Sequence, residues 1–226
     1  MESIDFTGVY ETFADALTKR FAEQKKRGGD FRVAEDTIRY FFFDAAVQKG
    51  GLKASDFWLE GHFFGKEESR KNLELDALIQ PEDGRKPVAI EFKYDRLGEN
   101  TDSEAKTRNA GKIYKDLNRL ASLSSPAKER LFVYVTEARM KNYFSGGNTQ
   151  WGKSVATLPL ECETTAVISA KAVRELKDKD GCGTFYNGAT DDGRFAFEQD
   201  ISVTRLFSHE CGENEFLYIF KVEQRV

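Results

Sequence analysis

Hydrophobic and polar positions alternate in two short runs, residues 72–79 and 87–96, which flank a turn-like segment containing Pro, Asp and Gly. Alternation with a period of two is typical of β-strands, so the two runs predict a hairpin. In this hairpin Asp76, Glu91 and Lys93 share one face, together with Glu74. Charges on an otherwise apolar face are costly unless they pair with each other or bind a metal. The hairpin is therefore the first candidate for a functional site.

Apolar residues recur with the period of an α-helix in three other segments, and two more segments have the composition of strands. The expected helices are residues 6–21, residues 31–48 with Asp30 as a cap, and residues 110–123. The expected strands are residues 57–64 and 131–136, and residues 97–108 are expected to form a polar loop. From about residue 30 to residue 137 the predicted order is thus helix, three strands, helix, strand.

The pattern changes after residue 139. The expected features are a glycine-rich loop over residues 142–153, one or two strands within 155–169, a short helix at 170–177, turns over 180–193, and strands at 195–207 and 216–222. We therefore expect residues 1–140 to form a core with an N-terminal helix. Residues 141–226 would form a β-rich C-terminal extension packed on that core, serving as an addition, a dimerisation surface or a substrate selector.

Composition is that of a globular protein. The 226 residues are 32% charged and 40% hydrophobic, and 19 Phe favour a well-packed core over disorder. Three widely spaced cysteines favour reduced thiols in the cytoplasm, and two histidines without a C-x-x-C pair argue against structural zinc. No apolar run approaches the length of a membrane span, and the first residues do not resemble a signal peptide. We expect a cytoplasmic protein without a membrane partner.

The net charge of −4 does not by itself indicate a nucleic-acid partner. Its distribution is more informative, because residues 102–153 hold 10 Lys and Arg but 5 Asp and Glu, a local charge of +5. Phosphate binding depends on such local charge rather than on the total. Lys112 and Lys115, on the helix that follows the hairpin, are candidates to contact a DNA backbone. The alternative is that both are simply solvated.

The charged hairpin has a specific chemical interpretation. Two carboxylates on neighbouring strands can share a hard cation such as Mg²⁺, while an ammonium group contacts the attacking water or a phosphate. Asp76 followed by Glu91-Phe92-Lys93 resembles the motif of the PD-(D/E)xK nuclease superfamily, although Leu75 stands where the family pattern has proline. The predicted order of elements is that of its restriction-endonuclease-like αβββαβ core. The resemblance therefore implies an α/β fold with a mixed central sheet, to which the β-rich C-terminal addition is joined.

The resemblance also implies roles for individual residues. Asp76 and Glu91 would bind Mg²⁺, or Mn²⁺ in its place, with the main-chain carbonyl of Phe92 as a further ligand. Glu35, on the N-terminal core helix, would reach the metal directly or through water; alternatively it is a first-turn glutamate that interacts with the helix dipole. Lys93 would orient the attacking water and help to deprotonate it.

We therefore expect a Mg²⁺-dependent endodeoxyribonuclease that hydrolyses phosphodiester bonds in DNA. Cleavage of both strands would suit a homodimer with one site for each strand. Two alternatives stay open at this point. One is a non-catalytic module with the same fold that binds nucleic acid or another protein. The other is an ordinary sheet in which Glu91 and Lys93 form cross-strand salt bridges.

Overall fold

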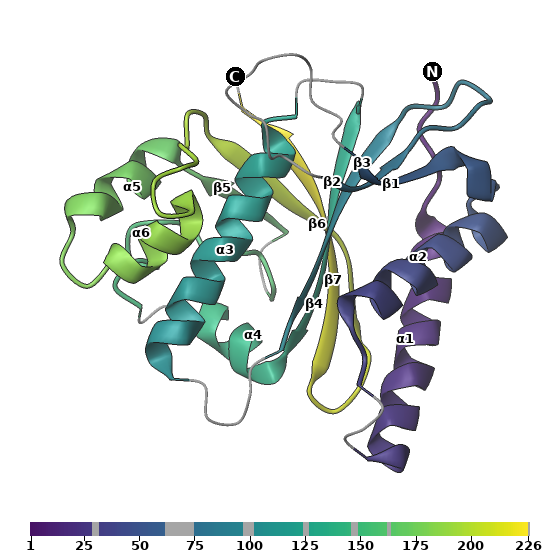
Figure 1. Ribbon diagram of the computed structural model, residues 1–226, viewed down its shortest axis with the longest axis horizontal. Helices are drawn as coiled ribbons and strands as arrows, with labels where there is room; N and C mark the ends of the chain where they lie inside the picture. Colours follow the sequence, from purple (N-terminus) through teal and green to yellow (C-terminus); the bar gives the residue numbers. More distant parts are fainter. Residues whose placement is uncertain are drawn as a thin grey trace.

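A computed structural model describes residues 1–28, 32–61, 75–96, 102–123, 127–145, 149–161 and 164–225. Within these residues one mixed seven-stranded sheet lies between two layers of helices. Figure 1 shows α1 and α2 on one face of the sheet and α3 to α6 on the other. The strand order is β1-β2-β3-β4-β7-β6-β5. Only β3 and β4 pair in parallel among the described strands, as expected for two strands joined through a helix.

The expected order of helix, three strands, helix, strand is confirmed. It is made of α2 (Glu35–Lys49), β1 (Phe57–Gly61), β2 (Leu75–Ile79), β3 (Val88–Asp95), α3 (Ser103–Ala121) and β4 (Glu129–Glu137). The 3₁₀ turn η1 (Ala54–Asp56) leads into β1, and α1 (Thr7–Arg27) precedes the whole unit. The chain therefore has the α/β architecture and the mixed central sheet that the sequence predicted.

Strands from the C-terminal part continue the same sheet beyond β4. The remaining elements are α4 (Ala138–Ser145), β5 (Thr165–Ile168), α5 (Ala170–Glu175), η3 (Leu176–Asp178), α6 (Gly183–Thr190), β6 (Ile201–Glu210) and β7 (Glu215–Gln224). β7 pairs antiparallel with β4 along its length, and β6 and β5 follow. The region after residue 140 thus adds both strands and helices to the core layers.

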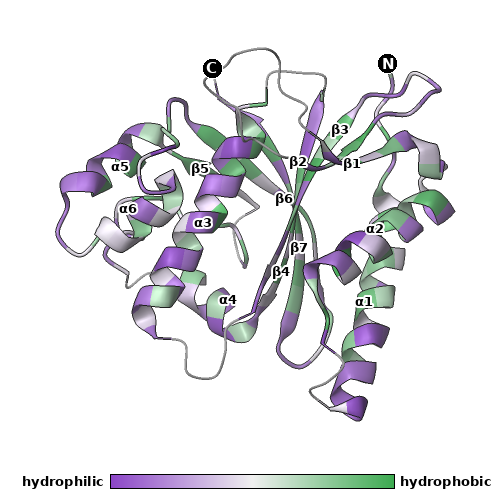
Figure 2. Ribbon diagram, viewed as in Figure 1, coloured by the Kyte–Doolittle hydropathy of each residue, from purple (hydrophilic) through white to green (hydrophobic). Residues whose placement is uncertain are grey.

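Two hydrophobic cores lie on opposite faces of the sheet. In α1 the buried residues Val9, Phe13, Leu17 and Phe21 are spaced one turn apart, so a single face of the helix packs on the sheet. Phe42 of α2 joins this core and contacts the ring of Phe92 in β3 edge-on. On the other face, α3 packs between the sheet and α6. Hydrophobic stretches along the strands are interrupted by hydrophilic residues, and α1 and α3 carry both kinds of residue along their length (Figure 2).

The structure corrects several expected boundaries. Helix α2 begins at Glu35, and Asp30 lies outside the described residues. Helix α3 begins at Ser103 within the expected polar loop, because the side chain of Asp102 accepts a hydrogen bond from the Ala105 N–H and caps the helix. The second half of helix α4 lies in the segment that was expected to be a glycine-rich loop, and helix α6 lies in the segment that was expected to be turns. No helix in the described ranges combines the length and apolarity that a bilayer span requires.

Candidate functional site

The two strands of the predicted hairpin separate at the residues that carry the motif. β2 and β3 pair between Ala77 and Ile90 and on toward the turn. On the other side of Ala77, the side-chain carboxylate of Asp76, and not a backbone carbonyl of β2, accepts the hydrogen bond from β3. Its Oδ2 accepts a hydrogen bond of 2.7 Å from the Phe92 N–H. The opposite edge of β3 stays paired with β4 as far as Asp95. The result is a fork in the sheet, lined by one edge of β3.

A second carboxylate reaches the same edge of β3 from α2. Glu35 Oε2 accepts a hydrogen bond of 3.0 Å from the Tyr94 N–H, one position further along the same edge than Phe92. Because the N–H and C=O groups of one strand residue point to the same side, the Phe92 carbonyl also faces the fork. Glu35 thus lies on the same edge of β3 as Asp76, and it also lies in the first turn of its helix, as the alternative interpretation has it.

Arg39, one turn after Glu35 on α2, neutralises the carboxylates at the fork. Its Nη2 donates to Asp76 Oδ1 at 2.8 Å and to Glu35 Oε1 at 3.2 Å. Its Nη1 donates to Glu60 Oε1 at 3.2 Å and lies 3.7 Å from Asp36 Oδ1. Burial on its own would lower the pKa of Arg39, but the charges of Asp76 and Glu35 outweigh that effect and raise it. Arg39 therefore stays protonated and linked to the acids around it.

Glu91 lies opposite Asp76 and is buried between the sheet and α3, with 2% of its surface exposed. Arg119 Nη2, from the C-terminal half of α3, donates to Glu91 Oε1 at 2.6 Å. Burial raises the pKa of Glu91 well above its usual range, and the negative charge of Asp76 raises it further, while Arg119 acts in the opposite direction. Raised pKa values caused by burial and a second carboxylate are typical of functional sites. Asp76 and Glu91 thus form a closely coupled pair.

Lys93 is half-buried and follows Glu91 on the same face of β3. Two further acids surround its charge. Burial raises the pKa of Asp95, and Lys93 counteracts this more than any other group. Burial also raises the pKa of Asp116 on α3, where Arg119 and then Lys93 oppose it. A layer of partly compensated charges therefore lies between β3 and α3.

The two lysines expected to contact DNA lie in different surroundings on α3. Lys112 is exposed, and its charge reaches Asp95. Lys115 forms an ion pair of 3.7 Å with Asp191, at the end of α6. Of these two lysines, Lys112 is thus the one whose charge is exposed to solvent. Glu74 lies outside the described residues.

Arg39, Asp95, Asp116 and Arg119 belong to the cluster but were not predicted from the sequence. One signal did exist, because the spacing of Glu35 and Arg39 is that of an ion pair on consecutive helical turns. Asp116 and Arg119 have the spacing of a solvated pair on a helix surface. The sequence gives no indication that this surface of α3 faces Glu91.

A divalent cation such as Mg²⁺ needs hard oxygen donors, and the fork offers several. Within the described ranges, no three His, Cys, Asp or Glu side chains converge as a ready metal-binding group. Mg²⁺ nevertheless requires only one or two protein carboxylates, because it keeps several water ligands. The coupled pair of Asp76 and Glu91, with the Phe92 carbonyl on the same edge, supplies hard oxygen donors of that kind. The donor set therefore fits Mg²⁺ or Mn²⁺.

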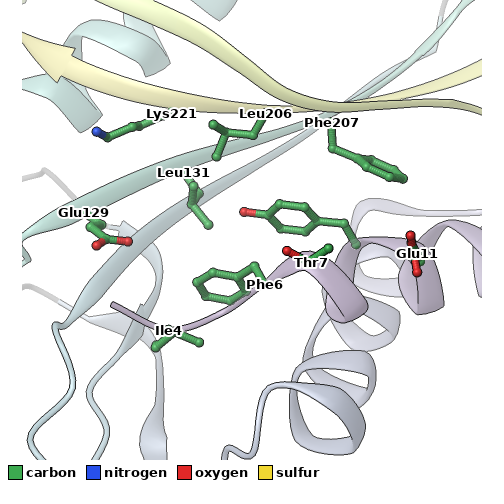
Figure 3. A pocket seen from close by; sticks show the side chains of 10 residues that line it. Ile4, Phe6, Thr7, Glu11, Glu129, Leu131, Leu206, Phe207 and Lys221 are labelled. Atoms are coloured by element: carbon green, nitrogen blue, oxygen red, sulfur yellow. The ribbon is translucent and has the colours of Figure 1, made fainter. Parts of the chain in front are cut away.

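One pocket lies away from the fork, near the N-terminus. A pocket of about 340 Å³ is lined by the start of α1 and by β4, β6 and β7, including Phe6, Leu131 and Phe207 (Figure 3). It shares no residue with the charged cluster. Among the residues that line it, Glu11, Glu129 and Lys221 carry charge and the others are mostly apolar.

No family model, curated protein or solved structure matches this chain significantly.

Proposed function

We propose that this protein is a metal-dependent nuclease that hydrolyses phosphodiester bonds in DNA. The observation that carries the proposal is the coupled carboxylate pair of Asp76 and Glu91 at the fork, with Lys93 next along the same face of β3. The order α2-β1-β2-β3-α3-β4 around this motif supports membership of the PD-(D/E)xK nuclease superfamily and its restriction-endonuclease-like fold.

In this proposal Asp76 and Glu91 hold Mg²⁺ or Mn²⁺, with the Phe92 carbonyl as a further oxygen ligand. The cation supplies charge stabilisation and a more acidic bound water. The hydrogen bond from the Phe92 N–H fixes the Asp76 carboxylate at the edge of β3. The Asp76 carboxylate is thus held by the backbone of the strand that carries Glu91.

Lys93 orients the attacking water and offsets the negative charge that develops on the phosphate. The backbone beside Lys93 is held in place, because Glu35 accepts the hydrogen bond of the Tyr94 N–H. Glu35 thereby anchors the backbone next to Lys93, and its carboxylate lies on the same edge as the metal ligands. It would reach the cation directly or through water. Lys112 is the exposed cation on α3 that would contact the DNA backbone, and a homodimer would provide one site for each strand.

A second candidate is a non-catalytic module that keeps the same site for structural reasons. The bonds of Arg39 to Asp76 and of Arg119 to Glu91 favour it, because they balance both carboxylates without a cation. Such a protein would bind nucleic acid or another protein through the same fold.

Cleavage assays distinguish the two candidates. Supercoiled plasmid and labelled single-stranded DNA are incubated with the protein in Mg²⁺, Mn²⁺ or EDTA, beside the variants Asp76→Asn and Lys93→Ala. Lys53→Ala serves as the control, because Lys53 is 72% exposed and pairs only with Glu82 among the described residues. We expect cleavage in either metal and none in EDTA, with a loss of about 100-fold or more in both site variants.

Cleavage that persists in Lys93→Ala would contradict the role given to this lysine. Metal binding without cleavage of any DNA would favour the non-catalytic module. Absence of both cleavage and metal binding would overturn the proposed nuclease.

A further inference from the structure

We propose that Arg39 and Arg119 compete with the metal for the carboxylates of the site and give them up when a divalent cation binds. The inference rests on the proposed function and assigns these two arginines a part in it. Arg39 approaches the carboxylate pair from α2 on one face of the sheet, and Arg119 approaches it from α3 on the other (Figure 1).

The arginines bond to the atoms that the metal would need. Arg39 donates a hydrogen bond to Asp76 Oδ1 at 2.8 Å, and Asp76 Oδ2 accepts one from the Phe92 N–H. Arg119 takes Glu91 Oε1 at 2.6 Å. A cation shared by the two acids would therefore compete with guanidinium groups for carboxylate oxygens that already accept their hydrogen bonds.

Neither arginine is held in the strongest available geometry. Arg–carboxylate pairs are strongest when two parallel N–H groups bond to the two oxygens of one acid. Here Arg39 spreads its Nη2 over two different acids, and Arg119 makes a single bond to Glu91. In both residues the Nε–H is buried and has no partner among the described residues. A buried donor without a partner is unfavourable, so neither guanidinium gains its full set of hydrogen bonds in this state.

The arginines offset the carboxylates of the site before a cation arrives, which keeps the fold stable in its absence. Two guanidinium groups carry a charge of about +2, as one Mg²⁺ does. Both arginine side chains are already partly exposed, at 18% for Arg39 and 19% for Arg119, so solvent is within reach of each. Arg39 keeps Glu35 and Glu60 as partners when it gives up Asp76.

Metal titrations of single-arginine variants test the exchange directly. The Kd for Mn²⁺ is measured by isothermal titration calorimetry for the wild type, Arg39→Gln and Arg119→Gln. Removing a competitor lowers the Kd, and we expect about tenfold tighter binding in each variant, which corresponds to about 1.4 kcal/mol. Arg20→Gln is the matched control, because Arg20 also has a buried unpaired Nε but pairs with Glu23 on α1. Its Kd should equal that of the wild type.

The outcomes separate the exchange from the nuclease itself. Tighter binding in both site variants, or binding that appears only in them, supports the exchange. Equal or weaker binding in the variants beside a wild type that binds Mn²⁺ overturns the exchange and leaves the proposed nuclease standing. Absence of binding in the wild type and in both variants overturns the exchange and the metal site together.

A second measurement uses the unaltered protein and does not depend on how well the variants fold. The Nε–H signals of Arg39 and Arg119 are followed by nuclear magnetic resonance during a Mg²⁺ titration and assigned by their loss in the variants. We expect both signals to shift in step with metal occupancy, while that of Arg20 stays in place. Unchanged signals at saturating Mg²⁺ would overturn the exchange, since a purely structural arginine would keep its partners.

Discussion

Glu91 is the residue whose ionisation most directly affects the site. Burial raises its pKa, and the charge of Asp76 raises it further. When the protein unfolds, Glu91 returns to the usual pKa of a glutamate. The folded state therefore retains a proton over a pH range in which the unfolded state has lost it, and stability falls across that range as the pH rises.

This linkage gives a prediction for Glu91→Gln, which mimics the protonated residue. Wild type and variant should be similarly stable at acidic pH, below the usual glutamate pKa. As the pH rises toward the raised pKa, the wild type should lose stability relative to the variant by about 1.4 kcal/mol per pH unit. Urea unfolding over a pH series measures the difference, and Mg²⁺ should restore the wild type by favouring the carboxylate. A difference that stays constant with pH would contradict the assignment.

Asp76 has a structural task besides its proposed catalytic one. Its carboxylate accepts the Phe92 N–H and bonds to Arg39. We predict that Asp76→Ala lowers the free energy of unfolding by about 1–3 kcal/mol, because it leaves the Phe92 N–H without its acceptor. Denaturant unfolding in EDTA measures the change. An alanine variant as stable as the wild type would mean that repulsion between Asp76 and Glu91 outweighs these bonds.

At this scale the sequence predicted the acids better than their partners. Asp76 and Glu91 were expected together, because strand alternation and the family motif both point to them, and Glu35 was a candidate from helical spacing and the family resemblance. Arg119 and Asp116 were not, since their contacts with β3 depend on how α3 is rotated against the sheet. Alternation tells which strand residues share a face, but it does not tell which helix residue covers them.

At the scale of elements, α3 packs most extensively against α6, where the two helices cross. A Cβ on Gly188 would lie 2.6 Å from the Arg108 carbonyl oxygen, and a Cβ on Gly111 would lie 2.4 Å from that of Phe185. The two glycines let the backbones of α3 and α6 approach closely. The crossing thereby fixes α3, which carries Arg119, Asp116 and Lys112.

We predict opposite effects for two glycines of α6. Gly188→Ala should lower the free energy of unfolding by about 1–3 kcal/mol, because the added methyl group separates the helices. Gly183→Ala, at the start of the same helix, meets no atom within 4 Å and should be neutral or stabilise by up to about 1 kcal/mol. Thermal unfolding of the two variants compares them. Equal effects would show that helix propensity, and not the crossing, decides.

The same crossing explains why α6 forms a helix although its segment was predicted as turns. Its sequence from Gly183 to Thr190 contains two glycines and several residues that favour turns, so local propensity argues against a helix. Packing against α3 overrides that propensity. The start of α3 was missed for a different reason, because residues 103–109 are mostly polar and only the cap at Asp102 indicates a helix.

At the scale of the whole molecule, the sheet joins the motif-bearing region to the C-terminal strands. The parallel pairing of β3 with β4 followed from the predicted order of elements. The position of β7 beside β4 did not, because strand order depends on long-range pairing that local patterns do not encode. The fold class was therefore predictable, whereas the seven-strand order was not.

The distribution of charge leads to a prediction about DNA binding. Lys112 is exposed, whereas Lys115 is paired with Asp191. Lys112→Ala should weaken binding uniformly across DNA sequences and reduce the slope of log affinity against log salt by about 1. Lys115→Ala should have a smaller effect. Fluorescence anisotropy with labelled DNA at several NaCl concentrations provides both slopes, and a larger effect of Lys115→Ala would contradict the assignment.

The central claim is that Asp76 and Glu91 together hold the divalent cation at the fork. Diffraction from crystals soaked in Mn²⁺, recorded where manganese scatters anomalously, locates the ion without reference to activity. We predict an anomalous peak between the two carboxylates, on the edge of β3 that carries the Phe92 carbonyl. Absence of a peak there, with Arg39 and Arg119 still bonded to their acids at saturating Mn²⁺, would contradict the account.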